Sequence, residues 1–115
     1  MTPVPQIPQG FVPDLIAVDV DDTLVEHLGG VSERVVRSIE RVREAGIAVA
    51  IATGRTPSTT IPVARAAGID DLVVCSNGAL LVSVETEKVV ESFTFDPRPV
   101  LEELVQHLPE AVFAV

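Results

Sequence analysis

LIAVDVDDTL, residues 15–24, joins an apolar, β-prone run directly to three carboxylates, and this stretch decides the fold. Side chains two positions apart on a strand point to the same side, so Asp19 and Asp21 should lie side by side where a strand from Leu15 to Val20 ends. Carboxylates crowded in this way repel each other, and a hard cation such as Mg²⁺ or a shared proton offsets that cost. The stretch therefore predicts a reactive site at the carboxyl end of a strand.

The residues that follow predict a helix and a second strand. Ser32 suits the N-cap of a helix from Glu33 to about Ala45, and Gly46 suits a left-handed C-terminal cap. Ile47 to Ala52 is again a continuous apolar run that is too short for a helix. A strand, a helix and a strand over this length predict a right-handed βαβ unit with parallel strands.

A second helix and a third strand continue the pattern. Pro57 to Ala67 predicts a helix, because proline is tolerated in a first turn and Gly68 closes the segment. Pro62 lies inside this helix, so we expect the helix to be short, kinked or late to start. Leu72 to Cys75 predicts the third strand, which ends in the polar turn residues 76–78.

The pattern changes near Ala79. Two β-prone runs, Leu80 to Val84 and Val89 to Phe95, flank a short charged turn and predict a β-hairpin. Prolines then introduce a helix from Pro97 to about Leu108, and Ala111 to Val115 predicts one more strand. The chain is therefore expected to hold parallel βαβ units first and a second, hairpin-led piece afterwards.

Composition argues against several classes of partner. The 115 residues carry a net charge of −9, which argues against nucleic acid and anionic membranes because both need basic patches. No apolar run reaches the roughly 20 residues that span a bilayer, and the N-terminus does not resemble a secretory signal. The lone Cys75 cannot form an internal disulfide, so we expect a cytoplasmic protein. Residues 1–14 carry four prolines and predict an extended, disordered tail.

Three segments together resemble one family. Residues 19–24, DVDDTL, resemble the nucleophile motif D-x-D-[GD]-T-[LV] of the haloacid dehalogenase-like (HAD) hydrolases. Residues 51–55, IATGR, are similar to the second motif of this family, a Thr or Ser that ends the next strand. The segment that leads into the cap of the Cof-type, subfamily IIB phosphatases resembles CSNGA at residues 75–79. Each match ends a predicted strand, and the three in this order are far more specific than one D-x-D.

This resemblance implies an α/β fold, with a partial Rossmann-like core of three layers and parallel strands, followed by the start of an α+β cap. On this basis the chain divides into a Pro-rich tail at 1–14, the partial core at 15–78 and the beginning of a truncated cap at 79–115. The resemblance also implies a Mg²⁺-dependent phosphohydrolase. Its substrate would be a small phosphorylated metabolite, such as a sugar phosphate, that reacts through an aspartyl-phosphate.

The resemblance assigns roles to the clustered carboxylates. Asp19 would be the nucleophile that accepts the phosphoryl group. Asp21 would protonate the leaving alcohol as an acid and then activate water as a base. Asp19 and the backbone carbonyl of Asp21 would bind Mg²⁺. Asp22 would only shape the turn, since the family often has glycine at this position.

Roles also follow for the second and third motifs. Thr53 would donate a hydrogen bond to the phosphoryl oxygens, and Gly54 would allow the backbone to approach closely. Arg55 would either hold the substrate phosphate or pair with an acidic loop, and both alternatives stay open. Asn77 would shape a turn with Gly78 and is also a candidate for substrate contact.

Two family features are missing from these residues. The family uses a lysine that steadies the aspartyl-phosphate and a late G-D-x-x-N-D-type motif, whereas the single lysine here, Lys88, lies in the hairpin turn. The family's core also has two further strands beside the first strand. We therefore expect an N-terminal fragment that turns over little substrate by itself. Its exposed edge should lead it to self-associate or to pair with a missing C-terminal half.

Other functions stay open. A phosphomutase similar to phosphomannomutase would share these motifs and pass the phosphoryl group to a second sugar hydroxyl instead of water. A catalytically inert structural fragment is a further alternative. A phosphoacceptor module of the receiver type fits less well, because such modules place the acidic pair and the acceptor on different strands.

Overall fold

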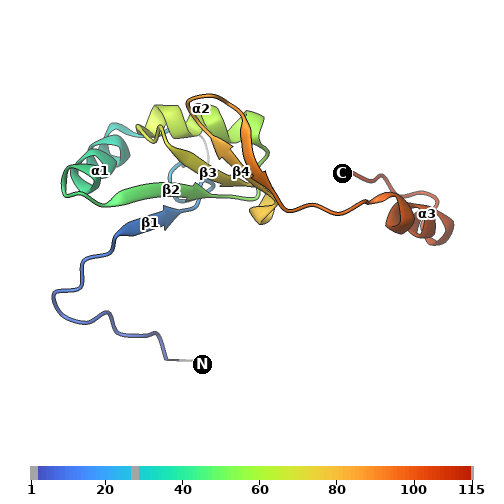
Figure 1. Cartoon of the computed structure of the whole chain (residues 1–115), viewed down its shortest axis with the longest axis horizontal. Helices are drawn as coiled ribbons and strands as arrows, with labels where there is room; N and C mark the ends of the chain where they lie inside the picture. The colour runs from blue at the N-terminus through green and yellow to red at the C-terminus, as the bar shows by residue number, and fades with distance from the viewer. Residues whose placement is uncertain (1–2, 27–28, 115) are drawn as a thin grey trace.

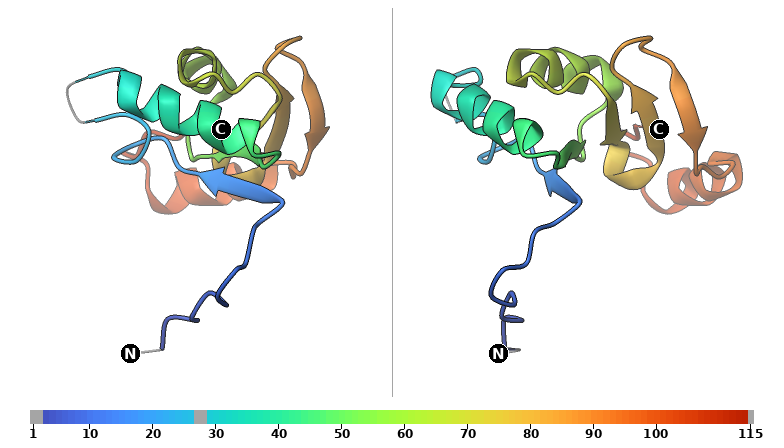
Figure 2. Two further views of the ribbon diagram at one scale, coloured as in Figure 1. Left: turned by 90° about the vertical axis from the view of Figure 1, so that its left-hand side faces the viewer. Right: turned by 60° about the vertical axis from the view of Figure 1, so that its left-hand side comes forward.

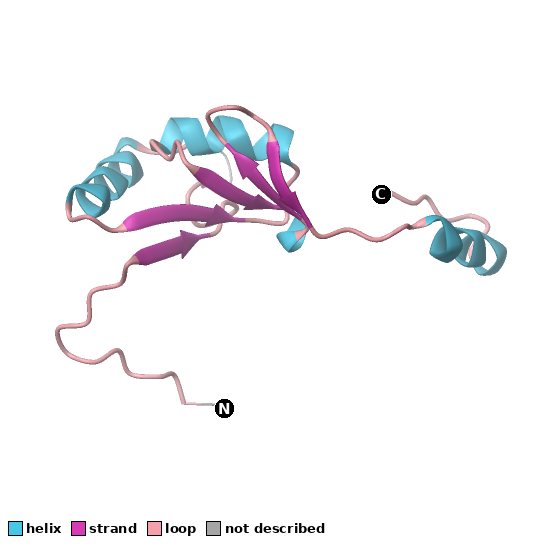
Figure 3. Cartoon of the chain, in the orientation of Figure 1, coloured by secondary structure: helices cyan, strands magenta, loops and turns pink. Residues whose placement is uncertain are grey.

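A computed structural model describes residues 3–26 and 29–114, which form one five-stranded sheet, two helices packed on it and a third helix apart from it (Figures 1 and 3). Residues 3–14 form no helix or strand and lead away from the sheet (Figure 1). In chain order the elements are β1 (Leu15–Val18), α1 (Glu33–Glu44), β2 (Ala48–Ala52), α2 (Pro57–Ala67), β3 (Leu72–Cys75), the 3₁₀ turn η1 (Ser76–Gly78), β4 (Leu80–Ser83), β5 (Val89–Ser92) and α3 (Arg98–His107).

The strands follow the order β1-β2-β3-β4-β5 across the sheet. β1 and β3 both run parallel to β2, with Leu15 opposite Ala48 in the first pair. β3, β4 and β5 pair antiparallel, with Cys75 opposite Leu80. The α/β class with parallel strands and the β-hairpin are thus confirmed, and the hairpin continues the same sheet. The domain division at Ala79 stays a prediction, although the sheet runs across that point.

One face of the sheet is covered by helices. α1 and α2 lie on the same side of the sheet (Figure 2), and alternate strand residues on that side are buried. In β2, for example, Val49 and Ile51 are buried whereas Ala48 and Ala52 are exposed. On β1, Leu15 keeps 54% of its surface exposed. The described residues therefore form two layers with the core between them, and leave the second face of the sheet uncovered.

Capping residues set the ends of α1. The Ser32 hydroxyl accepts the Val35 N–H at 3.3 Å, which satisfies one of the free donors at the start of the helix. Gly46 follows the last turn with a left-handed φ of +81°, which glycine adopts without steric cost. The helix predicted from Glu33 is confirmed.

α2 is continuous from Pro57 to Ala67, and Gly68 closes it in the left-handed region. The expectation that Pro62 shortens the helix or delays its start is wrong. A proline there removes one backbone hydrogen bond. Its neighbours Ile61 and Ala64 are buried against the sheet side of the helix, and we attribute the continuity to this packing.

The C-terminal residues form less structure than the sequence indicates. α3 confirms the predicted helix, but none of its residues is buried and it lies away from the sheet (Figure 1). The expected strand from Ala111 to Val115 is wrong for the described part, since residues 111–114 form none. A strand needs a partner for its backbone groups, and this segment pairs with none of the strands described. None of the described helices is both long and apolar enough to cross a bilayer.

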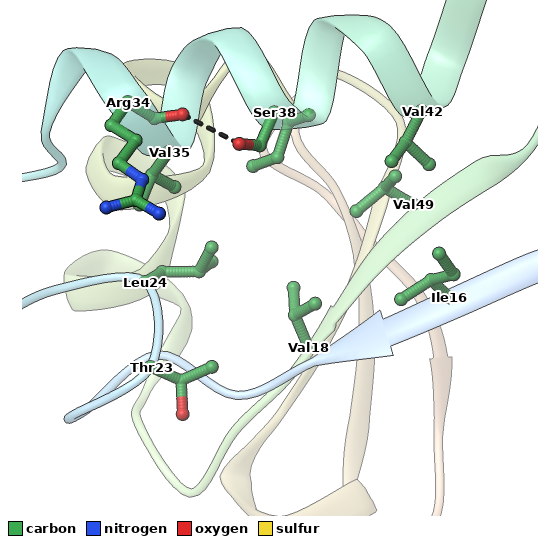
Figure 4. A pocket seen from close by; sticks show the side chains of 10 residues that line it. Ile16, Val18, Thr23, Leu24, Arg34, Val35, Ser38, Val42 and Val49 are labelled. Atoms are coloured by element: carbon green, nitrogen blue, oxygen red, sulfur yellow. Dashed lines mark hydrogen bonds between the residues drawn. The ribbon is translucent and has the colours of Figure 1, made fainter. Parts of the chain in front are cut away.

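An apolar cavity of about 280 Å³ lies between α1 and the β1 side of the sheet (Figure 4). Ile16 and Val18 line it from β1, and Val35 and Val42 line it from the helix. β1 is one of the two edge strands of the described sheet. The cavity therefore lies next to an edge of the sheet.

Candidate active site

The six predicted site residues lie at one end of the sheet. Asp19 and Asp21 follow β1, residues 53–55 follow β2, and Asn77 follows β3. These three strands are parallel, so their carboxyl ends meet at the same edge, where ligands bind in open α/β sheets. The structure therefore brings together three segments that are far apart in the sequence.

β1 ends in a tight turn. The strand stops at Val18, and the carbonyl of Val20 accepts N–H bonds from residues 23–25 at 3.0 to 3.3 Å. The predicted strand end at Val20 is two residues too late, because this turn takes the Val20 carbonyl away from the sheet. Asp21 lies inside the turn and forms an isolated bridge with Val25. The turn, rather than strand alternation, thus sets where Asp21 points.

Asp22 has a structural place in the same turn. Its backbone is left-handed, with φ at +58°. Glycine adopts this conformation freely, and Asp is among the few other residues that tolerate it. The Asp22 N–H donates to the Val25 carbonyl at 3.0 Å. This geometry supports the expectation that Asp22 shapes the turn.

Arg55 binds both carboxylate oxygens of Asp21. Nε donates to Oδ2 at 3.0 Å and Nη2 donates to Oδ1 at 2.5 Å. The hydrogen bond from Arg55 holds the pKa of Asp21 below its usual value, and the same bond raises the pKa of Arg55. The charge of Asp19 also raises the pKa of Arg55, so this carboxylate acts on the same guanidinium. Of the two roles expected for Arg55, the structure shows the pairing with the acidic loop.

Thr53 is buried, with 6% of its surface exposed, and backbone bonds hold it to the third strand. Its N–H donates to the Val74 carbonyl at 2.9 Å, and its carbonyl accepts the Asn77 N–H at 3.1 Å. The Thr53 hydroxyl accepts the Arg55 N–H at 3.1 Å. Because this contact uses Oγ1 as an acceptor, the hydroxyl proton remains available for a ligand.

A left-handed turn follows β3 and contacts the segment after β2. Ser76, Asn77 and Gly78 all have positive φ, at 52°, 56° and 93°. The Ser76 N–H donates to the Arg55 carbonyl at 2.8 Å. A β-carbon on Gly54 would lie 2.9 Å from Asn77 Oδ1, so glycine permits the close approach. The turn predicted at residues 76–78 is confirmed.

A polar cleft of about 540 Å³ opens beside these groups. Asp21 and Arg55 line it together with the loop after β1, which contributes Asp22, Val25, Glu26, Gly29 and Gly30. Sequence reasoning did not place these loop residues at the site. Paired glycines soon after the carboxylate motif were the available signal, because glycine is frequent where a chain bends around a ligand.

The chain's only lysine is remote from this end of the sheet. β4 runs antiparallel to β3, so the turn between β4 and β5 lies at the opposite end from Asn77. Lys88 belongs to that turn. It therefore does not complete the site at the carboxyl ends of β1, β2 and β3.

The carboxylates supply part of a metal site. Mg²⁺ keeps several waters and uses one or two carboxylates, which suits Asp21, at an open polar cleft, and Asp19 two residues before it. The residues thus fit the ion, although Arg55 engages both side-chain oxygens of Asp21. Over residues 3–26 and 29–114, no group of three or more metal-ligating side chains is found.

Comparisons with known proteins identify a family that matches most of the chain. A family described as haloacid dehalogenase-like hydrolase matches residues 16–113. The chain is similar to pyridoxal phosphate phosphatase YbhA of Escherichia coli, with 32% identity over 78% of this chain and 32% of that protein. It is also similar to phosphoglycolate phosphatase of Archaeoglobus fulgidus, with 34% identity over 62% of this chain and 30% of that protein.

A solved structure shows the same fold. A phosphatase of the haloalkanoate (HAD) superfamily from Bacteroides thetaiotaomicron aligns with a TM-score of 0.73 and 26% identity, over 90% of this chain and 39% of that one. The chain spans about a third of the length of the curated relatives that it matches.

Proposed function

Because the chain belongs to the haloacid dehalogenase-like hydrolase family, we propose that it carries the nucleophile end of a phosphatase active site. The substrate is a small phosphorylated metabolite, the metal is Mg²⁺, and the reaction passes through an aspartyl-phosphate. One observation carries the proposal. Asp19 and Asp21, which follow β1, and Thr53, which follows β2, lie at one end of the sheet, where Asp21 lines a polar cleft.

In the first half of the reaction, an Asp19 carboxylate oxygen attacks the phosphorus of the ester. The bond between phosphorus and the ester oxygen breaks, and Asp21 gives its proton to the departing oxygen. The Thr53 hydroxyl donates to a phosphoryl oxygen while charge builds there. The buried position of Thr53 and its backbone bonds to the third strand hold that donor in place.

In the second half, the phosphoryl group leaves Asp19. Asp21, now ionised, takes a proton from a water molecule as the water oxygen bonds to phosphorus. The bond between phosphorus and Asp19 breaks, which releases inorganic phosphate and restores both carboxyl groups. Mg²⁺, when bound by Asp19 and the Asp21 backbone carbonyl, offsets the repulsion between carboxylate and phosphate.

Two features support a small substrate. The cleft of about 540 Å³ matches the size of small-molecule sites, which is roughly 300 to 1,000 Å³. The curated relatives are named for pyridoxal phosphate and phosphoglycolate, and both compounds are small phosphate monoesters. We therefore place the substrate of this site in the same chemical class.

The partners and the location are proposals as well. β1 presents a free edge with no charged residue in Leu15–Val18, and one face of the sheet is open. Unprotected edges pair with other strands, so the chain should self-associate or pair with residues such as those that complete its longer relatives. The buried thiol of Cys75 is compatible with a reducing cytoplasm.

The test is phosphate release by the protein that carries this chain, measured with Mg²⁺ on pyridoxal phosphate, phosphoglycolate and sugar phosphates. Asp19→Asn should lower kcat by roughly 10³-fold or more with the fold intact, because an amide cannot serve as the nucleophile. Asp14→Asn, the same change just before β1, is the matched control and should leave kcat unchanged. Turnover retained in Asp19→Asn, or no Mg²⁺-dependent release from any of these esters, contradicts the proposal.

A further inference from the structure

Arg55 is a cation beside the acidic run, residues 19–22. The ion pair between Arg55 and Asp21 reaches this run, with Nη2 and Oδ1 2.5 Å apart. Other ion pairs involve Arg37, Arg43, Arg65 and Arg98, which bind carboxylates elsewhere on the surface. The charge of Asp19 acts on the same guanidinium. Arg55 thus supplies positive charge to Asp19 and Asp21, two of these crowded carboxylates.

The ion pair with Arg55 occupies the Asp21 carboxyl group, which the proposed reaction uses as acid and base. Both oxygens of the Asp21 carboxylate accept from Arg55, at 3.0 and 2.5 Å. A carboxylate held by two such bonds is oriented toward the guanidinium and presents fewer free lone pairs to a leaving group or to a second cation. Asp21 must therefore lose at least part of this contact before it works.

Phosphate is a natural alternative partner for Arg55. A guanidinium presents a planar fork of donors that matches carboxylate and phosphate equally well. Arg55 and Asp21 line the same cleft, so a phosphate that enters there meets both groups. The Arg55 backbone is fixed on two sides, because its N–H binds the Thr53 hydroxyl and its carbonyl binds the Ser76 N–H. Only the side chain has to turn.

We infer that Arg55 is an exchangeable counter-cation: it neutralises the acidic run while the cleft holds no phosphate, and it passes from Asp21 to the substrate phosphate when one enters. The inference rests on the proposed function only for the role of Asp21. Arg55 is then a positioning residue for the Asp21 side chain. Phosphate binding and the release of Asp21 are then one event.

The inference predicts two binding changes of opposite sign in Arg55→Ala. Mg²⁺ alone should bind more tightly, because a competing positive charge beside Asp19 and Asp21 is gone. Inorganic phosphate in the presence of Mg²⁺ should bind more weakly, because its guanidinium partner is gone. Each change should be roughly three- to tenfold, the scale of one partly exposed charge. If the role of Arg55 were merely structural, Arg55→Ala would bind both Mg²⁺ and phosphate more weakly.

Titration calorimetry with Mg²⁺ alone, and then with inorganic phosphate at saturating Mg²⁺, measures both changes. Arg43→Ala is the matched control, because Arg43 binds Asp70 at 2.6 Å at the other end of the sheet. Arg55→Lys keeps the charge and loses the fork, so it should restore the wild-type Mg²⁺ affinity but only part of the phosphate affinity. Mg²⁺ affinity that is unchanged or weaker in Arg55→Ala overturns the inference.

A measurement on the wild-type protein covers the case in which Arg55→Ala does not fold. The ¹H–¹⁵N signal of the Arg55 Nε, assigned through its loss in Arg55→Lys, should move on addition of inorganic phosphate with Mg²⁺. The ¹³C signal of the Asp21 carboxyl should move in the same titration. An Arg55 signal that stays in place, or one that moves without Asp21, overturns the exchange.

The two proposals fail in different ways. If no ester is hydrolysed but the opposite binding shifts appear, the proposed function is wrong and the exchange at Arg55 stands. If hydrolysis depends on Asp19 but Arg55→Ala binds Mg²⁺ no more tightly than the wild type, the function stands and the exchange is wrong.

Discussion

Gly54 and Asn77 are in direct contact across the candidate site, with Asn77 Oδ1 only 2.9 Å from where a β-carbon of residue 54 would be. The Asn77 N–H also donates to the carbonyl of Thr53, the residue before Gly54. The contact therefore couples the turn after β2 to the turn after β3.

Gly54→Ala should destabilise the protein by about 1 kcal/mol, because the new methyl group displaces the Asn77 side chain. Urea unfolding measures this. The added cost should disappear in an Asn77→Ala background, where the clashing oxygen is absent. Gly30→Ala is the control, since a β-carbon there meets nothing within 4 Å. Equal costs of Gly54→Ala in both backgrounds would show that the contact is unimportant.

Thr53→Val should lower kcat/KM by roughly 10²-fold, because it removes one donor to the developing phosphoryl charge. Thr60→Val is the matched control. Thr60 is also buried, but its hydroxyl donates to the Thr56 carbonyl within α2 at 2.8 Å. Loss of the Thr60 hydroxyl should reduce the free energy of unfolding and leave kcat/KM unchanged. If both variants lose the same activity, the effect is one of folding and Thr53 has no special role.

Ser32→Ala should cost about 1 kcal/mol of stability, because the Val35 N–H loses its cap. Ser38→Ala, in the middle of the same helix, should be neutral or slightly stabilising. The Ser38 hydroxyl only donates to the Arg34 carbonyl at 2.8 Å, and alanine is the better helix former. Thermal or urea unfolding of the two variants separates capping from side-chain volume, and equal losses would contradict a capping role.

Asp70→Asn should destabilise the protein at neutral pH and have progressively less effect in acid. The hydrogen bond from Arg43, together with its charge, holds the pKa of Asp70 below the ordinary value of 3.8. A lowered pKa in the folded state gives stability above pH 3.8 that is lost as the pH falls through the lower, folded value. Urea midpoints of the wild type and the variant should therefore converge below pH 3.8. A difference that persists there would exclude the pair as its cause.

Local chemistry made much of the fold predictable. Ser32 and Gly46 bracket α1, Pro57 and Gly68 bracket α2, and each segment forms the helix that its capping residues indicate. Such signals act over a few residues, so the sequence shows them directly. The convergence of the three motifs was also predictable, because parallel strands put their carboxyl ends at one edge.

Longer-range relationships were not predictable. Nothing within Leu80–Ser83 shows that its strand pairs with β3 and extends the core sheet, since edge pairing depends on which neighbours are free. The segment at 111–114 has strand-like residues but pairs with none of the described strands. For Arg55 the sequence offered two partners, and only the fold shows that Asp21 lies within reach of its side chain.

The left-handed turn at Ser76 has a consequence for engineering the protein. A serine in this left-handed conformation destabilises the folded state by roughly 1 to 2 kcal/mol, whereas glycine adopts the conformation without this steric strain. Ser76→Gly keeps the backbone N–H that binds the Arg55 carbonyl, so it should preserve the geometry while it relieves the strain. A selection for heat resistance should thus find one of its gains inside the candidate active site, where stability and turnover are selected together.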